Sequence, residues 1–269
     1  MPSSVELRWT ILRRLVQGSI GVALAAVPAV AQTQLWLKQF GSPSSEMNDF
    51  HKSTASSDGA GGVFVCGETA GSLGGPNLGS LDAWVARVDQ SGALLWLRQF
   101  GTTSWEMAAA TAPDGQGGVY VCGETDGNVG GPSAGQEDVW LARFDPAGTL
   151  VWARQIGTSK SDIPYAASSD DLGGVYVAGF TQGALHGTNN GGSDAFVARF
   201  APNGTLHWVQ QFGSTITDVA NAAAPDGVGG VVVAGYVEDS NDRDCWIVRL
   251  DARGTIQWRR EFGSPSVPG

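Results

Sequence analysis

A repeat of 56 residues is the feature of this sequence that most limits how the chain can fold. The motif Gly-Gly-Val, followed by an aromatic residue and a second Val, begins at Gly61, Gly117 and Gly173. It returns at Gly229 with Val232 in the aromatic position, which keeps the period unbroken. Copies of one unit bury their apolar residues between neighbouring units, so this repeat predicts a solenoid, a propeller or a similar array.

Two further motifs recur in step with the first. A segment that runs from Asp to Arg, with an aromatic third residue, occurs at residues 82–87, 138–143, 194–199 and 244–249. A Trp followed five residues later by Gly occurs five times, at Trp36, Trp96, Trp152, Trp208 and Trp258. The hydrophobic share of 42% and the 10 Trp are enough for a packed core, and they exclude a disordered or collagen-like chain despite the 39 Gly.

Each unit predicts four short strands. The first is rich in small residues (107–112, 164–169 and 219–224 in the second to fourth units), and the Gly-Gly-Val, Asp-to-Arg and Trp motifs supply the second, third and fourth. Four-residue turns that end in Gly92, Gly148, Gly204 and Gly254 join the third strand to the fourth, because Gly supplies the positive φ of a hairpin. Four strands in about 40 to 60 residues are typical of a propeller blade.

The prediction is therefore an all-β domain over residues 32–269, a β-propeller with four four-stranded blades of about 56 residues. The blade units span 42–101, 102–157, 158–213 and 214–263, and the Trp36 motif adds one extra outer strand at 34–41. Three alternatives remain open for that strand: the chain is a fragment of a larger propeller, four blades close with the strand surplus, or the open edges pair with another chain. An uncovered strand edge favours self-association.

The repeats resemble a known family, the SBBP β-propeller repeats of exported bacterial proteins. The likeness covers residues 34 to 263 and rests on the segment Gly191–Phe200, on Leu-x-Trp-x-x-Gln-Phe-Gly and on Val-Tyr-Val-x-Gly-x-Thr. The resemblance implies an extracellular propeller and brings no catalytic residues with it. The fourth repeat departs from the pattern, with Val237 in place of a Thr and a loop six residues shorter.

Residues 1–31 have the pattern of a signal peptide. Arg8, Arg13 and Arg14 precede an apolar stretch that ends in Ala29-Val30-Ala31, which predicts cleavage after Ala31 and a secreted, cell-surface or periplasmic protein. Cleavage removes three of the 16 basic and one of the 26 acidic residues, so 13 and 25 remain and the net charge is −12. This charge argues against nucleic acid as a partner, and no second apolar stretch predicts a membrane span in the mature chain.

The predicted binding face carries the loops between the second and third strands and between units, because these loops are long and differ between repeats. Trp105 occurs in one repeat only, beside Glu106 and at the position set of Asp162 and Asp218, which is the chemistry of a sugar-stacking site or of a Trp packed between blades. Glu68 and Glu124 occur in two repeats, as a solvated loop pair or as a carboxylate pair for acid–base chemistry.

Charged residues present in every repeat are predicted to stabilise the blade. Asp satisfies loop backbone N–H groups before the third strand at Asp82, Asp138, Asp194 and Asp244. Arg forms a repeated ion-pair or stacking ladder at Arg87, Arg143, Arg199 and Arg249. The sequence contains no metal-ligand spacing among its three His, no nucleophile motif and no phosphate loop, so it predicts no metal, cofactor or catalytic residue.

Two functions from different classes remain. The first is a non-enzymatic binding or scaffold module for a protein or glycan. The alternative is a propeller-type glycan lyase or hydrolase that uses the loop carboxylates.

Cys66 and Cys122 alternate with Ala178 and Ala234 at one repeat position, which predicts small buried residues there.

Overall fold

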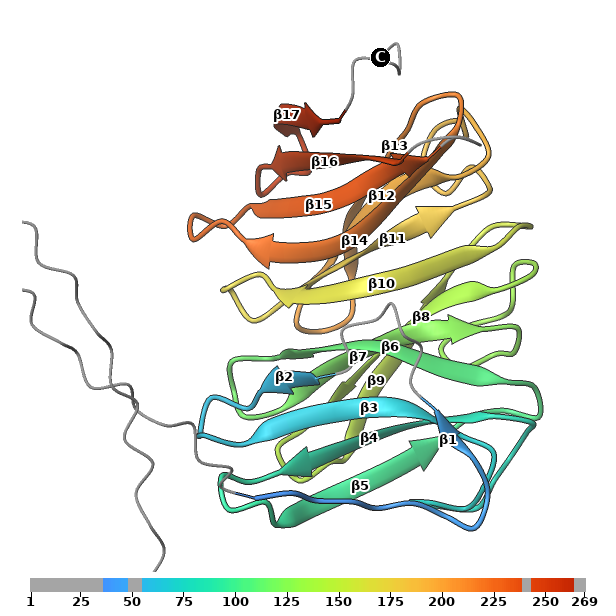
Figure 1. The fold of residues 1–269 in the computed structure, drawn as a ribbon, viewed down its shortest axis with the longest axis vertical. Helices are drawn as coiled ribbons and strands as arrows, with labels where there is room; N and C mark the ends of the chain where they lie inside the picture. The colour runs from blue at the N-terminus through green and yellow to red at the C-terminus, as the bar shows by residue number, and fades with distance from the viewer. Residues whose placement is uncertain (1–35, 48–54, 239–242, 264–269) are drawn as a thin grey trace, which may run out of the picture. The chain divides into compact units, whose positions relative to one another are not determined.

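Residues 36–47, 55–238 and 243–263 are described by a computed structural model of the chain. Within these ranges seventeen strands form four antiparallel sheets, and each sheet is built from consecutive strands (Figure 1). In the same ranges no helix is long and apolar enough to cross a membrane. The all-β prediction is confirmed, as is the prediction of one antiparallel sheet for each repeat.

The four sheets repeat one strand order. Sheet 1 contains β1 (Glu46–Met47), β2 (Ala55–Ser57), β3 (Val63–Thr69), β4 (Asp82–Val88) and β5 (Leu94–Phe100). Sheet 2 contains β6 (Glu106–Pro113), β7 (Val119–Thr125), β8 (Asp138–Phe144) and β9 (Leu150–Ile156). Sheet 3 contains β10 (Asp162–Ser169), β11 (Val175–Thr181), β12 (Asp194–Phe200) and β13 (Leu206–Phe212). Sheet 4 contains β14 (Thr217–Pro225), β15 (Val231–Glu238), β16 (Arg243–Leu250) and β17 (Ile256–Phe262).

The turn between the third and fourth strands has the predicted hairpin geometry. In sheet 2, the amide of Gly148 donates to the carbonyl of Asp145 (2.9 Å), and Gly148 has a φ of 75°. The Asp145 carboxylate accepts the amides of Ala147 and Thr149. The strand register shifts by one residue just before this turn, as a bulged hairpin requires.

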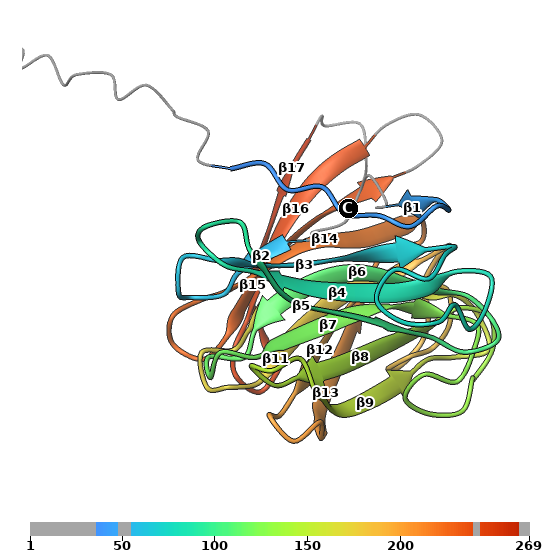
Figure 2. The ribbon, with the colours of Figure 1, turned by 90° about the horizontal axis from the view of Figure 1, so that it is seen from below.

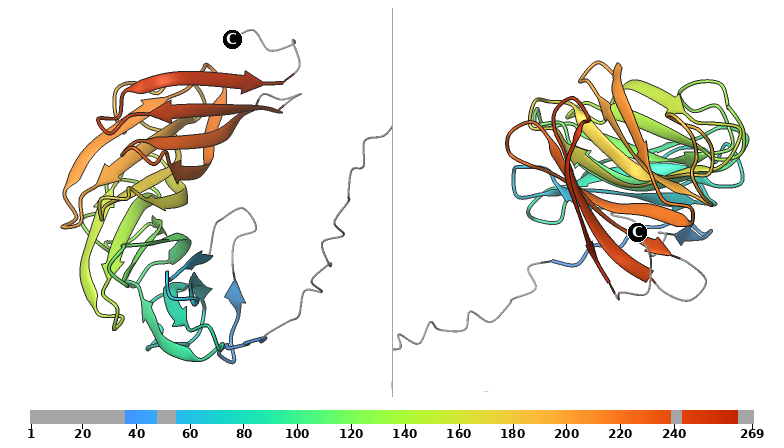
Figure 3. Two further views of the ribbon diagram at one scale, coloured as in Figure 1. Left: turned by 90° about the vertical axis from the view of Figure 1, so that its left-hand side faces the viewer. Right: turned by 90° about the horizontal axis from the view of Figure 1, so that it is seen from above.

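The core lies between successive sheets, which follow one another in chain order (Figure 2, Figure 3). The first strands β6, β10 and β14 lie side by side, and β6 also contacts β3. Ala108, Ala109 and Ala110 of β6 are completely buried, because only small residues fit where these strands approach. Cys66 and Cys122 are likewise completely buried, as their exchange with Ala predicts.

The extra N-terminal strand predicted at 34–41 is wrong, because the described residues 36–41 of this segment pair with no strand. Their side chains nevertheless contact sheet 1: the Trp36 indole donates to the carbonyl of Gln90 (3.0 Å), and the ring of Phe40 meets Trp84 edge-on at 5.5 Å.

Candidate functional site

The Asp at the start of each third strand holds the loop before it. Asp82 accepts the amides of Leu78 (2.9 Å) and Gly79 (3.2 Å), and it accepts Nε2 of Gln99 at 2.8 Å. Asp138 and Asp194 are also completely buried and have the equivalent Gln partners. Such carboxylates satisfy backbone donors that would otherwise be buried without an acceptor. Asp244, at the same position of sheet 4, is only half-buried.

The Arg of each third strand pairs with an Asp in the turn between the first and second strands. The nitrogen–oxygen distances are 3.0, 2.8, 2.8 and 2.7 Å for Arg87–Asp58, Arg143–Asp114, Arg199–Asp170 and Arg249–Asp226. Burial would raise the pKa of Asp58, but the hydrogen bonds from its turn amides and from Arg87 outweigh it and hold this pKa below the usual value. The Arg ladder therefore ties each sheet to its own turn.

Glu106, Asp162 and Asp218 occupy one repeat position and are all completely buried. Glu106 accepts the amide of Thr102 (2.7 Å) and the hydroxyl of Thr125 (2.9 Å). Asp162 and Asp218 accept the same type of loop donors, at 2.6 and 2.7 Å. Burial raises the pKa of Asp162, and the hydrogen bonds that it accepts oppose this shift only in part. One such carboxylate lies in each sheet, so the structure does not gather the three into one site.

Glu68 and Glu124 are not the solvated loop pair that the sequence favoured. Their exposed fractions are 1% and 6%, because both point from the second strand of their sheet toward the next sheet. Trp105 is half-buried: its amide donates to the Asp126 carboxylate (3.2 Å), and its backbone forms an isolated bridge to Leu81. The ligand-binding role predicted for these residues stays a prediction.

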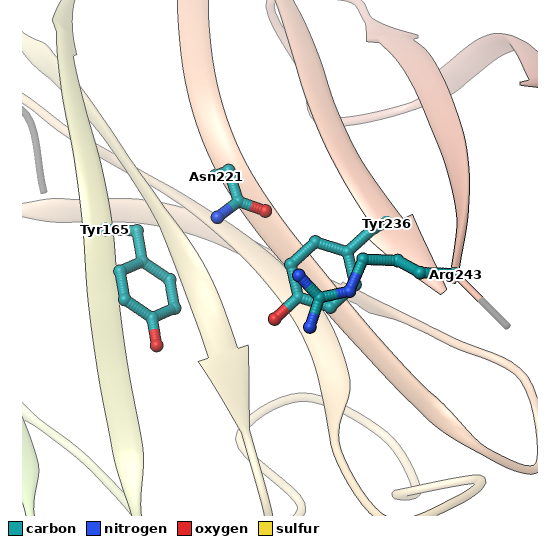
Figure 4. Close-up of a pocket in the computed structure, with 4 residues that line it drawn as sticks. All are labelled: Tyr165, Asn221, Tyr236 and Arg243. Atoms are coloured by element: carbon teal, nitrogen blue, oxygen red, sulfur yellow. The ribbon is translucent and has the colours of Figure 1, made fainter. Parts of the chain in front are cut away.

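A different set of side chains, from sheets 3 and 4, lines a pocket of about 230 Å³. The pocket is lined by Tyr165 of β10, Asn221 of β14, Tyr236 of β15 and Arg243 of β16. Figure 4 shows Asn221 between Tyr165 on one side and Tyr236 with Arg243 on the other. We call this group the four-residue pocket.

Two β-bulges place the first pair of pocket residues. The register of β10 against β11 shifts between Pro164 and Ala166, so Tyr165 is the extra residue, and its ring packs against Phe180 at 5.8 Å. The register of β14 against β15 shifts in the same way around Asn221. Bulges re-aim side chains out of the regular alternation and are common at binding sites.

The pairing of β15 with β16 places the second pair. Arg243 lies directly opposite Glu238 in the β15–β16 ladder, and its guanidinium donates to the Glu238 carboxylate at 2.7 Å. This hydrogen bond raises the pKa of Arg243, which keeps the side chain charged. The guanidinium also covers the ring of Tyr236, with 4.2 Å between its carbon and the ring centroid.

The pocket is equipped to bind a hydroxyl-rich ligand by hydrogen bonds. It offers two phenol hydroxyls, an amide and a cation, and Oδ1 of Asn221 is buried with no hydrogen-bond donor among the described residues. A buried acceptor of this kind is costly until a donor reaches it. No group of three or more His, Cys, Asp or Glu residues suited to a metal ion occurs in the described part of the chain.

Sequence reasoning missed the four-residue pocket, although the repeat contains its signal. Position 165 is equivalent to Ala109 and Asn221, so this position differs in every sheet that has a complete first strand. Position 236 is Glu in two repeats, Phe in one and Tyr only in the fourth. A residue that departs from the repeat is not required to stabilise the sheet in every unit, and Tyr165, Asn221 and Tyr236 line one pocket.

Comparison with known proteins gives one distant relative to report. No family model matches the chain. Regulatory protein FlaEY of Caulobacter vibrioides is 34% identical to it over 185 residues, which cover 62% of this chain. The matched region spans only 18% of the length of FlaEY.

Proposed function

We propose that this chain is an exported β-propeller of the SBBP type whose four sheets are its blades, and that it is a non-enzymatic module that binds a saccharide. The observation that carries the proposal is the four-residue pocket, in which Tyr165, Asn221, Tyr236 and Arg243 supply hydrogen-bonding groups from four different strands. Rigid strands, rather than loops, hold these groups, which keeps the site preorganised.

The chemistry of the pocket favours a sugar over an apolar ligand. A pocket of about 230 Å³ has room for a group the size of one sugar ring, and hydroxyls both donate and accept, as the amide of Asn221 and the two phenols require. The charge of Arg243 favours a sugar that carries a carboxylate. Glu68 and Glu124, which the alternative lyase or hydrolase would use, are too deeply buried to reach a polysaccharide.

The test is binding to an array of neutral and uronic acid-containing oligosaccharides, with affinities measured by titration of the oligosaccharides that give a signal. Asn221→Ala removes the buried acceptor and is expected to weaken binding about tenfold, the effect of one well-made hydrogen bond of roughly 1.4 kcal/mol. Gln257→Ala, which removes an exposed amide from β17, is the matched control and leaves binding unchanged.

Two results would contradict the proposal. The first is an array on which the wild-type protein gives no signal, and the second is equal affinity of the Asn221→Ala variant and the wild type. Export is tested separately: mass spectrometry of protein recovered from outside the cytoplasm is expected to find Gln32 as the first residue, because the predicted signal peptide ends at Ala31.

A further inference from the structure

One contact is repeated at every junction between sheets. The indole N–H of the fourth-strand Trp donates to a carbonyl in the hairpin turn of the next sheet, and the ring covers the glycine of that turn. The distances are 3.0, 2.9 and 3.0 Å for Trp96 to Pro146, Trp152 to Pro202 and Trp208 to Ala252. The repeated carbonyl and glycine form what we call the seat.

The seat of sheet 1 is occupied by residues 36–41, which we call the plug. Trp36 donates to the carbonyl of Gln90 at 3.0 Å and covers Gly92. The edge-on contact of Phe40 with Trp84 reproduces those of Phe100 with Trp140 and Phe212 with Trp246, with ring distances of 5.5, 5.2 and 5.4 Å. The plug therefore supplies the side chains of a fourth strand without the rest of a sheet.

The plug fills its seat incompletely. Trp36 is 37% exposed, whereas Trp96 in the equivalent place is 7% exposed. Val63 and Val65, on the face of sheet 1 that lies behind the plug, are only half-buried, whereas the equivalent Val119 of sheet 2 is completely buried. A segment held by side-chain contacts, with no backbone ladder, is replaceable by a complete strand.

The open face of sheet 4 carries the equivalent aromatic side chains, Trp258 and Phe262, and both are exposed. Trp258 is 37% exposed and donates no hydrogen bond within the described part of the chain. Phe262 is 56% exposed, whereas its equivalent Phe212 is 9% exposed. An apolar groove of about 410 Å³ runs along this face. It is lined in part by Ala234, Ile247 and Phe262, and it shares Asn221, Tyr236 and Arg243 with the four-residue pocket.

We infer that the open face of sheet 4 binds sheet 1 of a second copy of this chain, with Trp258 displacing the plug from its seat. The chain contains both halves of the junction that it already uses three times, so the contact continues an established interface. Trp258 and Phe262 have the same four-residue separation as Trp36 and Phe40, which makes the two segments competitors for one site. Such a head-to-tail contact generates rings or open chains of subunits.

The first test weakens the plug. Trp36→Ala with Phe40→Ala leaves all four sheets intact, since residues 36–41 belong to no strand, and light scattering after size exclusion gives the mass over a concentration series. The double variant is expected to associate at about tenfold lower concentration than the wild type, because roughly 1.4 kcal/mol of competing contact is lost. A double variant that remains monomeric overturns the inference. This includes a monomer in which Trp258 becomes protected from acrylamide quenching because sheet 4 binds sheet 1 of the same chain.

The second test removes the open face and does not depend on the plug. Phe262→Glu places a charge on an exposed side chain, so the variant folds and is expected to remain monomeric at every concentration. Leu172→Glu, at a residue that is 67% exposed in a turn of sheet 3, is the control and associates like the wild type. Association that survives Phe262→Glu, or no association of the wild type at the highest concentration reached, overturns the inference.

Discussion

The ion pair between Arg143 and Asp114 provides the sharpest test of what stabilises each sheet. The Asp114 side chain is completely buried, and it accepts Nη2 of Arg143 at 2.8 Å together with the amides of Gln116 and Gly118, each at 2.8 Å. Asp114→Ala therefore leaves the largely buried guanidinium of Arg143 and two turn amides without their acceptor. Breaking a buried pair by removing one partner costs about 3 to 5 kcal/mol.

Sheet 4 supplies the matched comparison. Asp226 makes the same contacts, but the side chain of its partner Arg249 is 32% exposed, against 16% for Arg143. Water solvates the guanidinium that Asp226→Ala leaves behind, so this variant is expected to lose only about half as much stability. Asp114→Asn, which keeps an acceptor for the turn amides, is expected to fall between the two.

The assay is thermal and urea unfolding followed by far-ultraviolet circular dichroism and Trp fluorescence. For a domain of this size, about 4 kcal/mol corresponds to a fall in Tm of roughly 8 to 16 °C for Asp114→Ala. Equal losses for Asp114→Ala and Asp226→Ala would show that burial of the guanidinium does not set the cost. A loss below about 1 kcal/mol for Asp114→Ala would mean that the pair behaves as a surface salt bridge, and the argument would fail.

Three further predictions rest on single sites. Cys245 is exposed and is expected to react with a thiol reagent in the native protein, whereas Cys66 and Cys122 react only after unfolding, as a time course of reagent release would show. Gly123→Ala is expected to cost about 3 kcal/mol in urea unfolding, because the new methyl overlaps a carbonyl oxygen of the paired strand; a neutral effect would contradict this. The folded-state pKa of Asp58 is lowered, so its stabilising contribution is present above its usual pKa of 3.8 and is lost as the pH falls through the lower, folded value. Melting curves from pH 6 down to about pH 2 measure this loss.

Repetition in the sequence was enough to predict the strands. Every unit has the same glycine in the turn between the third and fourth strands and the same Asp at the start of the third strand. Positions that are constant across units meet a structural requirement that is the same in every sheet. The φ of 75° at Gly148 is an example, since the hairpin demands it whatever the neighbouring sheets are. Local chemistry of this kind is visible without knowledge of the tertiary contacts.

The burial of the carboxylates was harder to predict. Glu68 and Glu124 lie in second strands that are buried over most of their length: all seven residues of β7 are buried, and none of β3 is exposed. The sequence does not show that both faces of these strands are covered. The extra strand at 34–41 failed for a related reason: the Trp motif specifies contacts with the next sheet, whereas strand pairing depends on a partner in its own sheet. The side chain of Trp36 makes the contact that the other Trp residues of the motif make, but its backbone does not form the predicted strand.

The position of the four-residue pocket depends on the pairing register of β10 with β11 and of β14 with β15. No sequence motif predicts that register, so the pocket could not be predicted. Tyr165 and Asn221 face the pocket because each is the extra residue of a bulge, and a bulge appears in the sequence as one more residue in a run of small ones. Ala109 is the extra residue at the same bulge in sheet 2, where a methyl group offers nothing to a ligand. The scaffold therefore supplies the same aimed position in each of these sheets, and the chemistry depends on which side chain stands there. Ala109→Tyr is therefore expected to change the stability of sheet 2 without creating saccharide binding, because the next sheet has Phe180 and Ser193 at the positions of Tyr236 and Arg243.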